Sequence, residues 1–395
     1  MRVVLAGYGS RGDVEPLIAL AVAVQNAGAE VVVCVPPDEE FVTRLDEFGV
    51  PFVAFGQSVR DLVTSRPVDP PRVAAALVDE WFGPVARAAE GADVLVASGL
   101  MPAGAPTVAE QFGLRYVLAA FHDISLPSPH RAPGQRPGKP FPPGETDNRV
   151  LWRIDAENVN AMYGPALNTH RAALGLPPVD NVRDHVYEGQ LLLAADPVLW
   201  PVPELTNLEV TQTGAWILPD SRPLSPELEA FLAAGEPPVY VGFGSMPMHA
   251  SKDVGQVAVD AVRAQGRRVL LARGWAGLAE LSGDDCFVVG EVNQQALFPR
   301  VAAAVHHGGG GTTTTAARAG APQVLVPQMV DQPYWARRVA DLGIGAAHDG
   351  PTPTFESLSA ALKTALDPET RVRAAEVAAQ VRADGAAVAA KLLVG

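Results

Sequence analysis

Residues 2–21 read "RVVLAGYGSRGDVEPLIALA", which predicts an apolar strand, a glycine-rich turn and the start of an amphipathic helix. Short, wholly apolar strands alternate with helical segments along the rest of the chain. That alternation is typical of parallel sheets covered by helices on both faces. A chain of 395 residues is too long for one core and suggests two domains of about 200 residues each. The expected fold class is therefore α/β, with two doubly wound sheets in series.

The alternating pattern starts again at "PPVYVGFGSM", with no detectable repeat of the first sequence. We expect an N-terminal domain over residues 1–200, a proline-rich interdomain linker over 201–228 and a C-terminal domain over 229–395. A single helix is expected over 368–393 at the end of the second domain. The segment 125–147, "SLPSPHRAPGQRPGKPFPPGETD", lacks periodicity and indicates either a surface linker or a substrate-facing lid.

Composition narrows the class of partner. The net charge of −14 argues against nucleic acid or an anionic membrane as the main partner, although a local basic pocket for phosphates remains compatible with it. The chain enters a strand at once and holds no apolar run of membrane-spanning length, so a cytoplasmic location is the default expectation. Cys34 and Cys286 lie in apolar runs, which favours buried hydrophobic side chains over a disulfide or a nucleophile.

The first glycine loop has the spacing of a dinucleotide-binding motif, with Gly7, Gly9 and Gly12 as G-x-G-x-x-G. Asp13 follows at the mouth of the helix, where its charge would repel a pyrophosphate. The second strand ends without the acid that binds ribose, and Asp38 comes late, in a proline turn. A nicotinamide or flavin enzyme is therefore disfavoured. Asp13 can cap the helix, accept a proton from an incoming hydroxyl, or do both.

A second glycine loop lies in "AVHHGGGGTTTTAARAGAPQVLVPQMVDQP", residues 304–333. Gly308–Gly311 follow His307 and precede a helix that carries Thr312–Thr315. Consecutive glycines let backbone N–H groups converge on an anion, and the helix dipole adds to the attraction. The imidazole and the threonine hydroxyls can donate hydrogen bonds as well. This pattern predicts a phosphate cradle, and it lacks the lysine of a P-loop.

A carboxylate and an amide follow the next strand, as Asp331 and Gln332. Side by side, such groups suit bidentate hydrogen bonding to vicinal sugar hydroxyls, although a solvated loop would also explain them. The sequence contains no Cys/His spacing typical of zinc. No metal site is predicted.

These motifs together resemble a known family. The H-x-G-G-x-G-T loop followed by D-Q is similar to the donor site of nucleotide-sugar glycosyltransferases of the GT-B fold, and "GSRGDVEPLIAL" is similar to their acceptor loop. The closer resemblance is to the actinomycete glycopeptide-antibiotic glycosyltransferases of the vancomycin and teicoplanin pathways. It runs almost end to end, through "LNTHRAALGLPPV", "TQTGAWILPDSRPLSPELEAFLAAG", "CFVVGEVNQQALF" and "AAHDGPTPTFESLSAAL".

The resemblance implies two Rossmann-like domains across a cleft, with the acceptor in the first and the nucleotide sugar in the second. It implies that Asp13 is the general base of an inverting, metal-independent transfer, which agrees with the absence of a D-x-D motif near the loop. Asp331 and Gln332 would hold the sugar, and Asp331 is the alternative base. Nucleotide or diphosphate contacts are implied for Ser10, Arg11, Gly12, Ser245, Arg273, Trp275, Val292, Gln294, Gln295, His307, Gly308, Gly309, Gly310, Gly311, Thr312 and Thr313.

Several segments depart from the family pattern. Four glycines stand where G-G-A-G is common, which we expect to loosen the loop slightly. Trp335 stands where Tyr or Phe is common, which we expect to change packing rather than chemistry. Residues 122–150 are idiosyncratic, and their candidate acceptor contacts are His122, Asp123 and Trp152. The chain ends in "AAKLLVG", so the final helix is expected to be truncated or simply short.

The expected function is transfer of a sugar from a UDP- or dTDP-sugar to a hydroxyl of a glycopeptide aglycone, a heptapeptide. The nucleotide sugar is then a co-substrate, and no cofactor is expected. One alternative keeps this chemistry with a macrolide, lipid or sterol acceptor, and another is a nucleotide-sugar epimerase of the GT-B fold. Asp13 together with a complete phosphate loop disfavours a binding module without catalysis.

Overall fold

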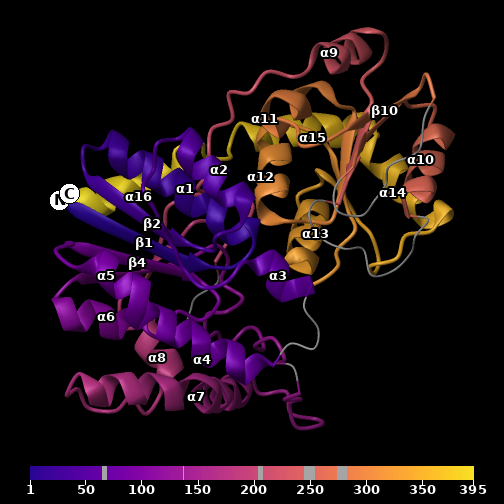
Figure 1. Ribbon diagram of the computed structural model, residues 1–395. Helices are drawn as coiled ribbons and strands as arrows, with labels where there is room; N and C mark the ends of the chain where they lie inside the picture. Colours follow the sequence, from indigo (N-terminus) through magenta and orange to yellow (C-terminus); the bar gives the residue numbers. More distant parts are fainter. Residues whose placement is uncertain (65–68, 137, 203–207, 244–253, 274–282) are drawn as a thin grey trace. The chain divides into compact units, whose positions relative to one another are not determined.

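The chain forms two compact units in the computed structural model, which describes residues 1–64, 69–136, 138–202, 208–243, 254–273 and 283–395 (Figure 1). The first unit comprises Met1–Ala195, Val202–Leu218 and Ala383–Gly395. The second unit comprises Asp196–Pro201 and Pro219–Arg382. Each unit is built on one parallel sheet with helices on both faces, so the predicted α/β class with two sheets is confirmed.

The first sheet has the strand order β3-β2-β1-β4-β5-β6-β7, all parallel. Its strands are β1 Arg2–Tyr8, β2 Glu30–Val35, β3 Phe52–Ala54, β4 Val94–Gly99, β5 Arg115–Ala120, β6 Gln190–Leu193 and β7 Val210–Gln212. Along β1, Val3 and Leu5 are buried on one face, and Val4 and Ala6 are buried on the other. The continuous apolar run in β1 thus reflects burial on both faces.

The helices of the first unit are α1 Arg11–Asn26, α2 Glu39–Glu47, α3 Val59–Thr64, α4 Pro70–Glu80, α5 Ala86–Ala89, α6 Ala105–Phe112, α7 Asn148–Ala173, α8 Val182–Val186 and α16 Gly385–Val394. A π-helical turn, Trp81–Val85, joins α4 to α5. Helices α1 and α16 cover one face of the sheet. Helices α5 and α6 cover the other face (Figure 1).

The second sheet has the order β10-β9-β8-β11-β12-β13, again parallel. Its strands are β8 Val239–Gly242, β9 Val269–Ala272, β10 Cys286–Val289, β11 Ala303–His306, β12 Gln323–Leu325 and β13 Gly345–Ala347. The helices of this unit are α9 Pro226–Ala233, α10 Val254–Ala264, α11 Gln294–Leu297, α12 Gly310–Arg318, α13 Gln332–Asp341, α14 Phe355–Ala365 and α15 Pro368–Ala378. Helices α10 and α14 cover one face, and α9, α11 and α12 contribute to the core on the other.

The observed units differ from the predicted division into 1–200, 201–228 and 229–395. Part of the proline-rich segment expected as a linker forms β7, which extends the first sheet by pairing with β6. The prediction of one helix over 368–393 is wrong, because this stretch forms α15 in the second unit and α16 in the first. The first residue of helix α16 packs closely against the backbone at Ala215, since a Cβ on Gly385 would lie 2.5 Å from the carbonyl oxygen of Ala215.

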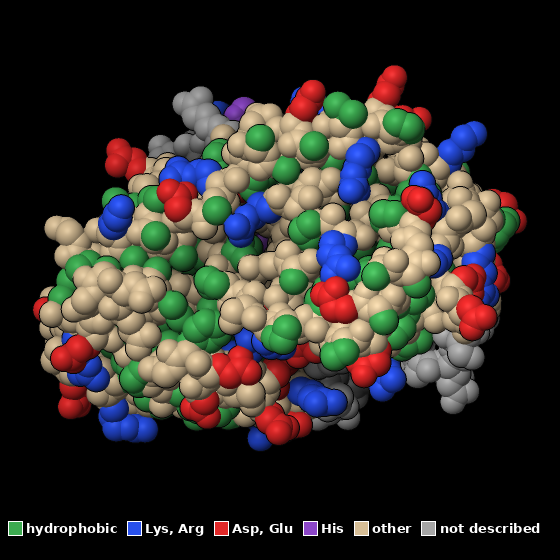
Figure 2. Space-filling model, turned by 90° about the horizontal axis from the view of Figure 1, so that it is seen from above, with side chains coloured by type: hydrophobic (Ala, Val, Ile, Leu, Met, Phe, Trp, Pro, Cys, Tyr) green, Lys and Arg blue, Asp and Glu red, His purple; other side chains and the backbone are tan. Residues whose placement is uncertain are grey.

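The two cysteines follow the prediction. Cys34 and Cys286 are both buried and neither forms a disulfide, as expected for small hydrophobic side chains, and burial raises the pKa of Cys34 to about 12. Acidic and basic side chains are interspersed over the face shown in Figure 2. Within the described residues, none of the helices has the length and the apolar character needed to cross a bilayer.

Candidate functional site

The candidate residues gather at the carboxyl edge of each parallel sheet. In the first unit, Asp13 follows β1 and Asp123 follows β5. In the second unit, Arg273 follows β9, Val292 follows β10 and His307 follows β11. Ligands of open α/β sheets bind at this edge, in the crevice outside the ends of the strands. The topology therefore places the predicted residues of each unit where a ligand site is expected.

Asp13 is positioned by the start of α1. The backbone N–H of Ser10, the residue that caps this helix, donates to Oδ2 of Asp13 at 2.9 Å. A Cβ on Gly9 would lie 2.2 Å from the same oxygen, so glycine is required to make room for the carboxylate. Arg11, expected near phosphates, pairs with Glu15 at 2.7 Å. Asp13 thus has a capping role, and it is also half-buried at the ligand edge of the sheet.

The dinucleotide hypothesis finds no support at Asp38. Its carboxylate accepts hydrogen bonds from the Ser58 hydroxyl and from the backbone N–H groups of Val59 and Arg60, at 2.8 to 3.0 Å. Asp38 therefore holds the start of α3, which leaves it engaged in the fold. Gly12, the third glycine of the motif, is exposed in the first turn of α1.

The candidate acceptor residues lie mostly in the interior. Asp123 is fully buried and pairs with Arg131 at 2.8 Å. Trp152 is also buried, and its Nε1–H donates to the carbonyl oxygen of Arg131 at 2.8 Å. His122 is partly buried and lies two residues after the end of β5. Asp123 and Trp152 are brought together by Arg131, and both hold the segment 125–147 to the body of the unit.

Two further contacts fasten this segment. The Arg136 guanidinium pairs with the buried carboxylate of Asp155 on α7 at 2.7 Å. The side-chain amide of Asn148 donates to the carbonyl oxygen of Pro129 at 2.9 Å. Sequence reasoning missed both arginines of the segment. Their presence within a stretch of proline and glycine was the available signal, because long cations there need acidic partners elsewhere.

The glycine loop of the second unit joins β11 to α12. Gly308 has φ +90°, a left-handed conformation that favours glycine. Gly309 caps α12, and a Cβ on it would lie 2.7 Å from Nε2 of His307. The first-turn N–H groups of a helix lack partners within the helix, so residues 310–312 present donors for an anion. The Thr313 hydroxyl donates to the Gly309 carbonyl oxygen at 2.9 Å, an engagement within the helix.

His306, the residue before the predicted His307, stabilises the glycine turn by hydrogen bonds. The N–H of Gly308 donates to Nδ1 of His306 at 3.1 Å, so Nδ1 carries no proton. Nε2 therefore carries the proton and donates to Oε1 of Gln323 at 2.9 Å. Burial, with a smaller effect of the neighbouring His307, lowers the pKa of His306 to about 3. A neutral imidazole thus supports the loop, a role that sequence reasoning missed.

The Asp331–Gln332 pair lies against the glycine loop. A Cβ on Gly308 would lie 3.4 Å from Cβ of Gln332, so the two segments are neighbours. Gln332 is buried, and its Oε1 accepts backbone hydrogen bonds from residues 328–329 at 2.7 and 3.2 Å. The amide therefore shapes the turn that carries Asp331. Oδ2 of Asp331 accepts a hydrogen bond from Nε1 of Trp335 at 2.8 Å.

The residue before this pair has an unusual backbone. Val330 has φ +54° and a side chain that is 65% exposed. A β-branched residue in the left-handed region is strained, and such strain is concentrated at functional sites. Burial lowers the pKa of the nearby His307, while the negative charge of Asp331 acts in the opposite direction.

The candidates for nucleoside contacts lie beside β9 and β10. Arg273 directly follows β9 and is exposed. The Gln294 amide donates to the Tyr240 hydroxyl at 3.3 Å, and Val292 and Gln295 are half-buried. Two remaining candidates lie outside the described residues, namely Ser245 and Trp275.

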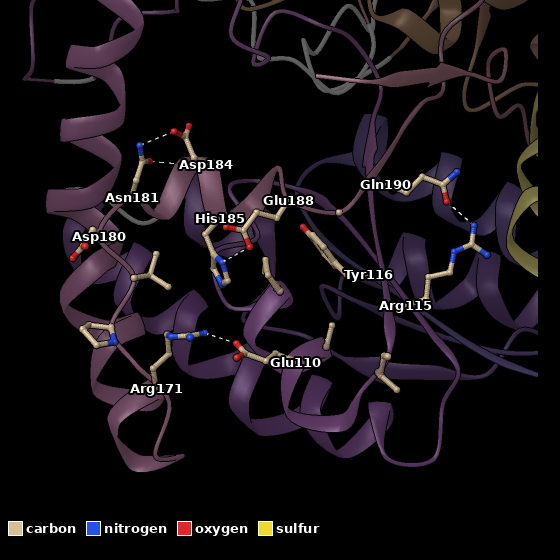
Figure 3. A pocket seen from close by; sticks show the side chains of 16 residues that line it. Glu110, Arg115, Tyr116, Arg171, Asp180, Asn181, Asp184, His185, Glu188 and Gln190 are labelled. Atoms are coloured by element: carbon tan, nitrogen blue, oxygen red, sulfur yellow. Dashed lines mark hydrogen bonds and ion pairs between the residues drawn. The ribbon is translucent and has the colours of Figure 1, made fainter. Parts of the chain in front are cut away.

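A cavity of about 770 Å³ opens elsewhere in the first unit (Figure 3). It lies at the amino ends of β5 and β6, the sheet edge opposite to that of Asp13. In its lining, Arg171 pairs with Glu110 at 2.7 Å, and the His185 ring lies 3.1 Å from the carboxylate of Glu188. This cavity is therefore separate from the candidate site.

Comparison with known proteins identifies the family. Residues 3–113 match the Glycosyltransferase family 28 N-terminal domain, and residues 270–391 match the Erythromycin biosynthesis protein CIII-like, C-terminal domain. Glycosyltransferase GtfE of Amycolatopsis orientalis is 54% identical, over 100% of this chain and 97% of the relative. The chain belongs to this family of glycosyltransferases. The vancomycin aglycone glucosyltransferase of the same organism is 52% identical, again over 100% and 97%.

Solved structures place this glycosyltransferase in the GT-B fold. The glycotransferase of kitacinnamycin matches with a TM-score of 0.76 at 20% identity, over 99% of this chain and 98% of that one. The spinosyn rhamnosyltransferase SpnG complexed with thymidine diphosphate matches with a TM-score of 0.68 at 19% identity, over 100% of both chains. The prediction of two Rossmann-like units is confirmed at the level of the fold.

Proposed function

We propose that this glycosyltransferase moves a sugar from a dTDP- or UDP-sugar to a hydroxyl of a glycopeptide aglycone, with inversion at the anomeric carbon. The similarity to a vancomycin aglycone glucosyltransferase and to a dTDP-epi-vancosaminyltransferase, the latter 49% identical over 95% of this chain and 93% of the relative, supports these substrates. The observation that carries the proposal is the contact between the glycine loop and the Asp331–Gln332 turn. A diphosphate and the sugar attached to it would bind side by side there.

In this proposal the second unit binds the donor. The N-terminal N–H groups of α12 receive the diphosphate, and the helix dipole favours its negative charge. His307, whose pKa is lowered by burial, is a neutral imidazole that can donate one hydrogen bond to the same oxygens. Asp331 accepts a hydrogen bond from a sugar hydroxyl. These donors stabilise the charge that grows on the leaving diphosphate, so the proposal needs no divalent metal.

Asp13 acts on the acceptor. Its carboxylate takes the proton from the acceptor hydroxyl while the hydroxyl oxygen forms a bond to the anomeric carbon. The bond between that carbon and the diphosphate oxygen breaks, and the nucleoside diphosphate leaves with the electron pair. Asp331 is the alternative base, because it belongs to the turn that would hold the sugar.

The test measures transfer and binding separately. Asp13→Ala is expected to lower kcat by about 10³-fold, since general bases contribute about 10²–10⁴-fold. The Kd of dTDP or UDP, measured by titration calorimetry, should stay within about twofold, because the α12 loop is untouched. Asp180→Asn, at an exposed carboxylate of the same unit, is the matched control.

Product masses from a panel of aglycones identify the acceptor. A glycopeptide product supports the proposal, and a product formed only from a macrolide, lipid or sterol contradicts the proposed acceptor. An epimerised donor without acceptor would identify an epimerase instead. Wild-type turnover in Asp13→Ala would exclude Asp13 as the base, and loss of turnover in Asp331→Asn with nucleotide binding kept would then favour Asp331.

A further inference from the structure

Gly310 of the glycine loop and the indole of Trp335 lie against each other in the structure. Gly310 lies in the first turn of α12, and Trp335 lies in the first turn of α13. A Cβ on Gly310 would lie 3.1 Å from Cζ2 of Trp335 and 3.3 Å from both Cε2 and Nε1. An alanine at position 310 would therefore displace the indole by a few tenths of an ångström.

The indole has little room to move. Trp335 is 3% exposed, and its ring also packs against Trp200, with ring centroids 4.7 Å apart at an angle of 57°. Because the interior is close-packed, displacement on the Gly310 side is transmitted to the neighbours of the ring. The glycine and the large indole thus fit each other in volume.

The polar edge of the same indole holds a carboxylate. Nε1 of Trp335 donates to Oδ2 of Asp331 at 2.8 Å, across one turn at the start of α13. Within the described residues, the other oxygen of Asp331, Oδ1, has no hydrogen-bond partner. A phenyl ring carries no N–H, and a tyrosine carries its hydroxyl at the far end of the ring. Trp335 therefore supplies a bond that neither a phenylalanine nor a tyrosine could place in the same way.

We propose that Gly310 and Trp335 form a matched pair that orients Asp331 for the donor sugar. Trp335 is the positioning residue, because its indole N–H fixes one carboxylate oxygen and directs the other toward a sugar hydroxyl. Gly310 provides the space that the indole occupies. This inference rests on the proposed function and adds that sugar recognition depends on a contact between α12 and α13. This proposal departs from the expectation that Trp335 changes packing rather than chemistry.

The functional test is a double-mutant cycle with Trp335→Phe, Gly310→Ala and the double variant. Each single variant should lower kcat/KM for the nucleotide sugar about tenfold, the size expected for loss of one hydrogen bond to a charged group. The double variant should also lose about tenfold rather than about 100-fold, because both changes remove the same bond. The Kd of the nucleoside diphosphate without sugar should stay within about twofold. Tyr334→Phe is the control, because it changes the aromatic residue next to Trp335 in the sequence and leaves the indole in place.

A spectroscopic measurement keeps the test independent of turnover. In protein labelled with ¹⁵N-tryptophan, the indole N–H resonance that disappears in Trp335→Phe belongs to Trp335. Gly310→Ala and Asp331→Asn should both shift this resonance upfield, because the bond to the carboxylate weakens. An unchanged resonance in Gly310→Ala would overturn the pairing.

The kinetic outcomes separate the pairing from the function. Multiplied losses in the double variant, or a loss confined to nucleoside diphosphate affinity, would overturn the pairing while the proposed function stands. A wild-type protein that binds neither dTDP, UDP nor their sugars would overturn the proposed function, and the role of the pair in sugar recognition with it.

Discussion

Burial holds the His306 side chain of the second unit in its neutral form. His306 accepts the Gly308 N–H and donates to Gln323, an arrangement that only the neutral ring can make. A protonated ring would carry a hydrogen on Nδ1 and lose the Gly308 bond. Gln323 accepts without bringing a negative charge, which would favour protonation. The conformation of the glycine loop therefore depends on the protonation state of His306.

This linkage predicts how stability depends on pH. The pKa of His306 is about 3 in the folded chain and near its ordinary value of 6.5 in the unfolded chain. Between these values the unfolded state binds a proton that the folded state does not. The contribution is thus complete above about pH 6.5 and falls as the pH drops, by up to about 1.4 kcal/mol per unit. Urea unfolding should show that the advantage of wild type over His306→Asn shrinks by about 2 kcal/mol between pH 7 and pH 5.

The control for this prediction is His130→Asn, because His130 is exposed. Measured in the same way, this variant shows how much the loss of an exposed histidine by itself changes stability at each pH. An advantage over His306→Asn that stayed constant from pH 7 to pH 5 would show that His306 takes up a proton as readily in the folded chain as in the unfolded chain.

Some of the residues of the candidate site could be predicted from the sequence. Asp13 and the four glycines stood out because charge and backbone freedom are properties of the residues themselves. The bond between Trp335 and Asp331 spans four positions at the start of a helix, so its spacing was available as a signal. The contact of Trp335 with Gly310 joins two helices, and local sequence carries no information about it.

At the scale of elements, the segment 125–147 is fastened to α7 rather than loosely attached. Arg136 pairs with the buried Asp155, and Arg131 pairs with the buried Asp123. An unpaired buried carboxylate is costly, so each pair resists opening of the segment. If the segment contacts the acceptor, as the sequence suggests, these pairs set the shape that the acceptor meets.

Arg136→Gln should therefore weaken acceptor binding selectively. The change leaves Asp155 without its cation, and the segment loses one of its attachments to α7. We expect the KM for the aglycone to rise about tenfold, or about 1.4 kcal/mol, with the KM for the nucleotide sugar unchanged. Steady-state kinetics with each substrate varied in turn provides the measurement. Arg149→Gln, at an exposed position beside the segment, is the control, and equal increases in both KM values would contradict the prediction.

Most elements could be predicted because their apolar periodicity is local. Strand β7 could not, since Val210–Gln212 is a three-residue edge strand in a proline-rich stretch that resembles a linker. The separation of α15 from α16 was missed because helical composition continues across 379–384. The Asp384–Gly385 pair was the local signal of a new start, as Asp-Gly marks turns.

At the scale of the whole molecule, the end of the chain belongs to the unit that contains its beginning. Helix α16 packs against α1, and Ala389, Ala390 and Leu393 enter the core of the first sheet. Arg115, at the start of β5, donates to the carbonyl oxygens of Leu392 and Leu393 at 2.8 and 3.3 Å. A cation at a helix C-terminus is also favoured by the helix dipole. The last residues thus contribute stability to the unit that carries Asp13.

This arrangement predicts that a destabilising substitution in α16 lowers the stability of the first unit. Leu393→Ala removes a buried side chain from the first core and should destabilise that unit by about 2 kcal/mol or more. Hydrogen exchange followed by mass spectrometry should show lost protection in α1, with α12 unchanged, because the two helices belong to different units. Leu362→Ala, in the core of the second sheet, should give the reverse pattern. Equal loss of protection in both units after Leu393→Ala would mean that the two units unfold together. In that case α16 would not stabilise the first unit selectively.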